Sequence, residues 1–181
     1  TMLWHYNGLG EGHSSVAIAN NKIYVTGLVD GNGHLFVFDL NGKLLNKKPY
    51  GPEWDTSYNG ARGTVTVNDG RIYVYSGQGG LVCFDENNLN IVWQKNVINE
   101  YQGSNIRWGV NESPLIVDDK VIITPGGTKH NVMALNKKTG DVIWSCAGQG
   151  DTPAYCSPLY VSNQQVPQIV TITAKHILGI D

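Results

Sequence analysis

Polar and aromatic side chains that could bind a ligand gather in four loops, and each loop leads into a short β-rich stretch. Arginine can donate a bidentate pair of hydrogen bonds to a carboxylate, tryptophan offers a flat stacking face, and the oxygens of asparagine and glutamate suit a hard cation such as Ca²⁺. A structural role is the alternative, in which Glu112 and Asn111 bond loop backbone amides, Arg62 pairs with Glu112, and Trp108 caps the core. The candidate ligand-binding residues are His13, Arg62, Trp108, Asn111, Glu112 and Tyr155.

Other site chemistries receive little support from the residue spacing. The five histidines include no H-E-x-x-H pair, and His34 and His176 occupy equivalent positions in two related segments, which favours a structural role. The three cysteines show no CxxC spacing, so Cys83 and Cys146 are expected to be small buried hydrophobes, whereas Cys156 lies in a loop. No Gly-x-Ser-x-Gly elbow is present, and neither a zinc site nor a serine nucleophile is predicted.

The amino-acid composition argues against a nucleic-acid partner and against a membrane-spanning segment. The net charge is −2 and the lysines and arginines are scattered, so the sequence lacks the basic footprint of a nucleic-acid-binding protein. No apolar run approaches the ~18 residues that a membrane span requires, and no signal-peptide pattern stands at residue 1. Charged residues make up only 15% of the chain, which suits a turn-rich all-β protein.

A repeat of 49 residues organises the elements that must position these loops. Residues 22–25, 71–74 and 120–123 match one another at that spacing, and each is followed by a second shared phrase. That phrase is clear in residues 83–93 and 134–144, and it begins once more at the end of the chain. A fixed period of this size indicates a repeat architecture.

Each unit divides at turn signals into four short strand-like runs, and its middle runs are apolar on both faces. Both faces of such a sheet must be covered, which four-stranded antiparallel blades stacked around an axis achieve. The sequence therefore predicts an all-β β-propeller segment with about four blades. The expected parts are an outer strand at 2–6, blade 1 at 14–48, blade 2 at 63–95, blade 3 at 113–146, and three strands of blade 4 at 156–181.

Tryptophans at the outer strands are expected to anchor neighbouring blades. Trp93 and Trp144 each follow a third-to-fourth-strand turn, and Gly140 in one such turn can take a positive φ. Trp4 is assigned the same anchoring role at the start of the chain. The first unit has no tryptophan at this place, and its anchor is expected to be weakened or replaced by leucine.

The phrase from Ala134 through Thr139 and Gly140 to Trp144 resembles the tryptophan-docking motif of PQQ-like β-propeller repeats. The family includes quinoprotein alcohol dehydrogenases, polyvinyl-alcohol-dehydrogenase-like proteins and an outer-membrane assembly lipoprotein, so the fold alone does not decide the function. The resemblance implies a ring of about eight blades. The chain is then a fragment of a larger propeller, a four-bladed ring sealed by residues 2–6 beside 176–181, or half of a ring made by two chains, and exposed blade edges favour homo-oligomers.

The resemblance leads us to expect a binding or scaffold module of an exported, periplasmic protein, with its signal segment outside this chain. Its funnel is expected to take a protein partner or a small molecule. The alternative is an alcohol dehydrogenase that uses PQQ and Ca²⁺. In that version Arg62 donates to a quinone oxygen, Asn111 and Glu112 are the candidate Ca²⁺ ligands, and Asp151 is the candidate catalytic base.

Overall fold

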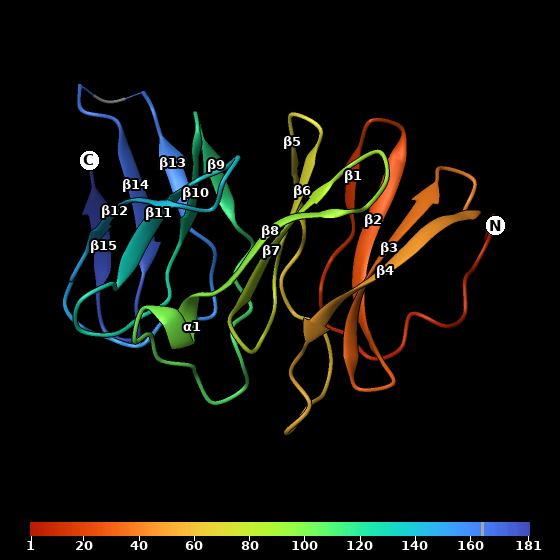
Figure 1. Ribbon diagram of the computed structural model, residues 1–181, viewed down its shortest axis with the longest axis horizontal. Coiled ribbons are helices and arrows are strands. Elements are labelled where there is room, and N and C mark those ends of the chain that lie inside the picture. Colours follow the sequence, from red (N-terminus) through yellow and green to blue (C-terminus); the bar gives the residue numbers. More distant parts are fainter. Residues whose placement is uncertain (164) are drawn as a thin grey trace.

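The computed structural model describes residues 1–163 and 165–181, whose strands form four separate antiparallel sheets standing in a row (Figure 1). Within each sheet the strands follow in sequence order, so each sheet is a simple meander. Blade 1 consists of β1 (Ala17–Ala19), β2 (Lys22–Val29), β3 (Asn32–Asp39) and β4 (Leu44–Pro52). Blade 2 consists of β5 (Thr66–Asn68), β6 (Arg71–Tyr75), β7 (Gly80–Asp85) and β8 (Ile91–Asn96).

The other two blades continue this arrangement. Blade 3 consists of β9 (Leu115–Val117), β10 (Lys120–Ile123), β11 (Val132–Asn136) and β12 (Val142–Cys146), and blade 4 of β13 (Leu159–Val161), β14 (Gln168–Ile172) and β15 (Ile177–Ile180). A single turn of helix, α1 (Val97–Glu100), follows β8 and was not expected. The prediction of all-β, antiparallel blades is confirmed.

Tight turns set the register of the first hairpin in blades 1 to 3. Asn20, Asn21, Asp69 and Asp118 all have positive φ, a conformation that Asn and Asp tolerate better than other side chains. The flanking residues pair directly, as Asn68 does with Arg71. The hairpins expected from these turn residues therefore form as predicted.

The hydrophobic core is divided among the spaces between blades. One cluster joins Leu35 and Val37 of blade 1 to Ile72 and Val74 of blade 2, all of them at most 4% exposed. Equivalent clusters lie between blades 2 and 3 and between blades 3 and 4. The sheets of blades 2 and 3 are thus buried on both faces, which explains why their middle strands do not alternate between apolar and polar residues.

A chain of hydroxyl contacts, which we call the hydroxyl ladder, joins the beginnings of the four blades. The backbone N–H of Ser15 donates to Oγ1 of Thr64 at 3.1 Å, and the N–H of Thr64 donates to Oγ of Ser113 at 3.0 Å. The N–H of Ser113 then donates to Oγ of Ser157 at 2.8 Å. These residues are equivalent in the repeat, so their recurrence in the sequence has a structural explanation.

Trp93 packs against a turn that contains Gly140 at the interface of blades 2 and 3. Nε1 of Trp93 donates to the carbonyl oxygen of Lys137 at 3.1 Å, and a Cβ added to Gly140 would lie 2.8 Å from the indole ring. At the other end of the row Trp4 covers Gly42 in the same manner. Both glycines have positive φ, +77° and +81°.

The interface of blades 1 and 2 is filled differently. Asn46 pairs with Val37 at the place where Trp93 pairs with Cys83. Leu89 occupies the turn position of Gly140, with a φ of +55°, and packs into the core cluster that contains Val37. The leucine that compensates for the missing tryptophan therefore comes from the neighbouring blade, and not from blade 1 itself.

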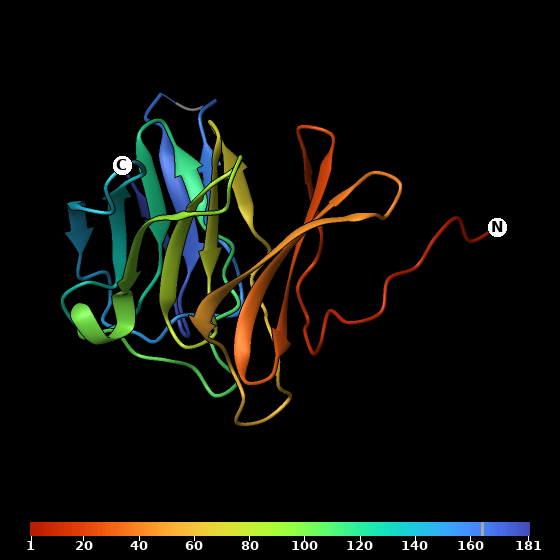
Figure 2. The ribbon, with the colours of Figure 1, turned by 45° about the vertical axis from the view of Figure 1, so that its right-hand side comes forward.

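The row of blades is an open arc. The N- and C-terminal ends lie at opposite ends of it (Figures 1 and 2), and the first strands contact one another in the order β1, β5, β9 and β13. The four-bladed ring sealed by residues 2–6 beside 176–181 is therefore not formed. Residues 2–6 make no strand, because no described strand lies beside their backbone. Within the described ranges no helix is long and apolar enough to cross a bilayer.

Candidate ligand-binding site

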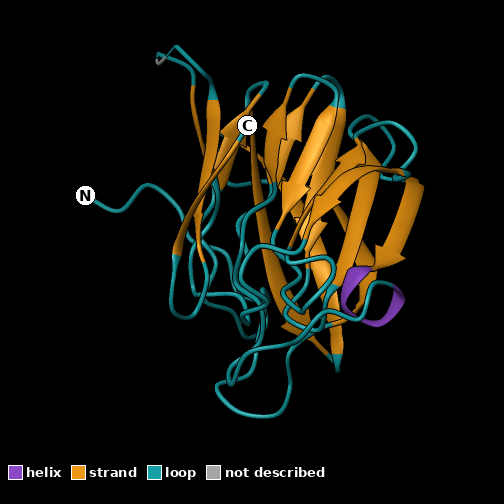
Figure 3. Cartoon of the chain, turned by 90° about the vertical axis from the view of Figure 1, so that its left-hand side faces the viewer, coloured by secondary structure: helices purple, strands orange, loops and turns teal. Residues whose placement is uncertain are grey.

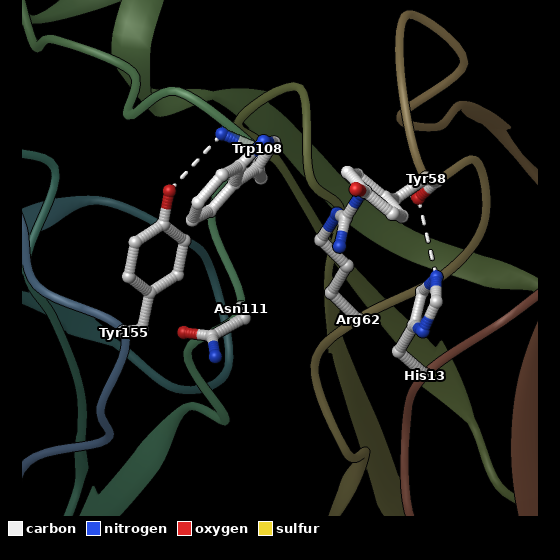
Figure 4. A pocket seen from close by; sticks show the side chains of 6 residues that line it. All are labelled: His13, Tyr58, Arg62, Trp108, Asn111 and Tyr155. Carbon is white, nitrogen blue, oxygen red and sulfur yellow. Dashed lines mark hydrogen bonds between the residues drawn. The ribbon is translucent and has the colours of Figure 1, made fainter.

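The long loops gather at one end of the strands (Figure 3) and surround a cavity of about 450 Å³. Loops that lead into the first strands of all four blades contribute to it. Such a cavity at a convergence of loops is the usual form of a small-ligand site. It is lined by His13, Tyr58, Arg62, Trp108, Asn111 and Tyr155 (Figure 4). The structure thus brings together five of the six residues named as candidates from the sequence.

One side of the cavity is aromatic. The rings of Trp108 and Tyr155 lie 5.8 Å apart between centroids, and the backbone N–H of Trp108 donates to the hydroxyl of Tyr155 at 3.1 Å. Tyr58 approaches Trp108 edge-on, with 6.3 Å between ring centroids. The three side chains are 38% to 73% exposed, so Trp108 does not cap the core as the structural alternative proposed.

Tyr58 belongs to the facing side, where Arg62 and His13 make the lining polar and positively charged (Figure 4). Nη2 of Arg62 donates to the carbonyl oxygens of Ser57, at 3.2 Å, and Tyr58. Nε2 of His13 lies 3.2 Å from the carbonyl oxygen of Tyr58. Partial burial lowers the pKa of Arg62, and the nearby Glu53 opposes that shift.

Two buried polar atoms at this cavity have no hydrogen-bond partner among the described residues. They are Nε of Arg62 and Oδ1 of Asn111. No carboxylate of the described chain lies within 4.0 Å of the Arg62 guanidinium, so the expected pair with Glu112 is not formed. The cavity therefore offers hydrogen-bonding capacity that the protein itself does not use.

Glu53 holds the loop that carries Tyr58 and Arg62. Its carboxylate is 1% exposed and accepts hydrogen bonds from the Tyr50 hydroxyl at 2.7 Å, the Trp54 N–H at 2.8 Å and the Gly77 N–H at 2.6 Å. Burial raises the pKa of Glu53, while these donors act against the shift. Sequence reasoning missed both Glu53 and Tyr58, and the available signal was the unusual length of this loop between two repeats.

Glu112 does not line the cavity. It is 1% exposed, and its two carboxyl oxygens accept from the N–H of Thr124 at 3.0 and 3.1 Å. Burial raises its pKa to about 8. Asn111 directly precedes it in the chain, and of these two neighbours only Asn111 lines the cavity.

Asp151 also lies apart from the cavity-lining residues. Its carboxylate accepts from the Thr173 hydroxyl at 2.8 Å and lies 2.7 Å from Nδ1 of His176. These contacts, that of His176 first, lower the pKa of Asp151. A carboxylate held in this way is a poor proton acceptor near neutral pH.

The residues present do not fit a bound Ca²⁺ ion. A calcium site takes six to eight oxygens with several carboxylates, whereas the cavity lining supplies no carboxylate at all. Residues 1–163 and 165–181 contain no group of three or more His, Cys, Asp and Glu side chains that could hold a metal. Asn111 and Glu112 therefore do not converge on a common cation position.

Comparison with known proteins agrees with the propeller architecture. Residues 1–152 match the sequence model of the family Outer membrane protein assembly factor BamB. No curated protein matches the sequence. BamB from Moraxella catarrhalis is similar in structure with 17% identity and a TM-score of 0.65, over 99% of this chain and 49% of that one.

Two further solved structures share the fold. Quinohemoprotein alcohol dehydrogenase ADHIIG from Pseudomonas putida HK5 is 18% identical with a TM-score of 0.67, over 92% of this chain and 29% of that one. The computationally designed Ika4 protein is 13% identical with a TM-score of 0.65, over 100% and 99% of the two chains. The chain thus spans about half of the natural BamB chain and less than a third of the dehydrogenase.

Proposed function

The chain belongs to the family of the outer membrane protein assembly factor BamB, and on that premise we propose that it is a binding or scaffold module of an exported protein. The module holds its partner at the loop end of the blades, over the cavity. The four blades supply a rigid frame, and the loops supply the contacts. Binding residues are often placed on loops that a rigid scaffold positions in this way.

The exposed aromatic side chains carry this proposal. Tyr58, Trp108 and Tyr155 expose 73%, 38% and 45% of their surface around one cavity. Exposing large aromatic groups to water costs free energy, and tyrosine, tryptophan and arginine are enriched among the residues that dominate binding interfaces. A cluster of all three types on one face is therefore best explained by a partner that covers it.

The family description supports an exported location beside the outer membrane. We accordingly assign the module to the periplasm or an equivalent compartment, where it would assist assembly by holding another protein. The likeness to quinohemoprotein alcohol dehydrogenase extends to the fold alone. No contact in the cavity favours the dehydrogenase alternative, since Glu112 and Asp151 are engaged elsewhere.

Site-specific photo-crosslinking in the cells that make the protein tests this function. A benzophenone amino acid is placed at Tyr58, at Trp108, or at Tyr160 as a control, because Tyr160 is also exposed, at 44%, but lies on β13 outside the cavity lining. We expect one shared crosslinked partner at positions 58 and 108 in the periplasmic or membrane fraction, and not at 160. Equal crosslinking at all three positions, or at none, would contradict the proposed binding face.

A further inference from the structure

We propose that the cavity binds a carboxylate attached to an aromatic or similarly flat apolar group. This inference rests on the proposed function, because it names the chemistry of the group that the loop face holds. In it Arg62 receives the carboxylate, the rings of Tyr58, Trp108 and Tyr155 enclose the apolar part, and the Asn111 amide bonds a further polar group of the ligand. In Figure 4, Trp108, Tyr155 and Asn111 lie on one side of the cavity, and Arg62, Tyr58 and His13 lie on the other, so one ligand would contact both sides.

Arg62 forms no salt bridge within 4.0 Å in the described chain, although the buried Glu53 carboxylate is near enough to favour its charged form. Its hydrogen bonds within the described chain all run from Nη2 to the carbonyl oxygens of Ser57 and Tyr58, and these bonds fix the guanidinium plane. The plane also lies over the ring of Trp54, at 5.8 Å from its centroid. A held guanidinium with unused donors is the geometry that carboxylates recognise, because two parallel charge-assisted bonds form without reordering the side chain.

Asn111 adds a second polar group to the same cavity. Its amide makes no hydrogen bond with any described residue, and its Oδ1 is buried. The amide nitrogen can donate to an acceptor of the ligand, while Oδ1 can accept from a polar hydrogen of the ligand. A buried oxygen without a hydrogen-bond partner costs free energy, so a ligand that brings a donor to Oδ1 would be favoured.

The shape and charge of the remaining lining limit the ligand further. The volume of about 450 Å³ admits one ring system with short substituents, and the tilted pair of Trp108 and Tyr155 offers a flat surface for it. Because no carboxylate lines the cavity, the negative charge of the ligand must be balanced by Arg62 and not by a bound cation. We therefore expect binding to be independent of divalent metal ions.

Titration with three probes tests this inference, with the fluorescence of the protein's tryptophans and calorimetry as readouts. The probes are N-acetyl-phenylalanine, its neutral amide, and phenylacetate. We expect both acids to bind, with and without EDTA, and the amide to bind at least tenfold more weakly, which corresponds to about 1.4 kcal/mol. Tighter binding of N-acetyl-phenylalanine would identify the carboxyl end of a peptide as the source, and tighter binding of phenylacetate would identify a free aromatic acid.

A pair of arginine variants tests whether the acids bind at Arg62. Arg62→Met should weaken binding of the acids at least tenfold, while Arg107→Met should change it less than twofold. Arg107 is a matched control, because it is exposed and stacks on Trp108 at 5.1 Å but does not line the cavity. Arg62→Lys keeps the charge and should retain part of the affinity.

Two results would overturn the inference: equal binding of acid and amide by the unmodified protein, or equal loss in the Arg62 and Arg107 variants. Comparing acid with amide needs no variant, so it stands even if Arg62→Met folds poorly. If neither acid binds but crosslinks form at Tyr58 and Trp108, the carboxylate inference fails and the binding module stands. If neither acid binds and no specific crosslink forms at Tyr58 and Trp108, both the carboxylate inference and the proposed binding module are wrong.

Discussion

Replacing Gly140 by alanine should destabilise the protein more than the same change at Gly70. Both glycines lie in turns with similar backbone angles, φ +77° and +70°. A Cβ at Gly70 would meet nothing within 4 Å, whereas at Gly140 it would lie 2.8 Å from the ring of Trp93. The two substitutions therefore share a backbone penalty and differ in one packing contact.

The magnitudes follow from these two effects. A non-glycine residue with left-handed φ costs about 1 to 2 kcal/mol, which applies to both variants. Overpacking against a rigid, buried ring adds about 1 to 3 kcal/mol for Gly140→Ala alone. Urea unfolding followed by circular dichroism measures the difference, and with a slope of about 2 kcal/mol/M the two midpoints should differ by roughly 0.5 to 1.5 M.

A double-mutant cycle identifies Trp93 as the cause. In a Trp93→Leu background the excess penalty of Gly140→Ala should largely disappear, because the ring that it meets is gone. The interface of blades 1 and 2 already lacks the tryptophan and has a larger residue in the turn, with Asn46 opposite Val37 and Leu89 at the position equivalent to Gly140. Equal midpoints for Gly70→Ala and Gly140→Ala in the unmodified background would refute the packing argument.

Three further predictions concern hydrogen-bonded polar side chains. Burial raises the pKa of Glu112 from 4.5 to about 8, so the stability that it contributes is present below pH 4.5 and is lost as pH rises towards 8; Glu112→Gln should flatten the unfolding free energy measured across that range. Ser113→Ala leaves the Thr64 N–H without its acceptor and should cost about 1 kcal/mol in urea unfolding, whereas Ser113→Thr should cost less. Glu53→Ala removes the acceptor of the Gly77 N–H and two other donors, and hydrogen exchange should quicken at residues 53–62 while β10 remains protected.

Much of the fold could be predicted because the repeat shows the same pattern of strands and turns in several copies. The turn residues Asn20 and Asp69 indicated tight hairpins, and the middle strands, which are apolar on both faces, indicated sheets buried on both sides. The blades confirm both predictions. Residues 2–6 were expected to form a strand, which was wrong for a local reason. A strand needs a backbone neighbour as well as a suitable sequence, and none lies beside these residues in the described chain.

The cavity could be anticipated in outline, since loops entering equivalent strands must converge at one end of a blade array. Arg62 and Trp108 line it together with three other candidates. Glu112 does not, because it is buried and accepts from the Thr124 N–H, a contact that depends on the tertiary fold and left no sign in the sequence. Tyr58 depends on a loop conformation that the buried Glu53 determines, and such a contact depends on the tertiary fold.

The hydroxyl ladder has a consequence for how such a chain can change in length during evolution. Each repeat carries both halves of the joint, a backbone donor and a hydroxyl acceptor, at a residue such as Thr64 or Ser113. A duplication or loss of one whole 49-residue unit would therefore join new neighbours through the same bond, without a compensating substitution. The tryptophan and leucine contacts are specific to their own interfaces, so they would be the places where a recombined array first needs repair.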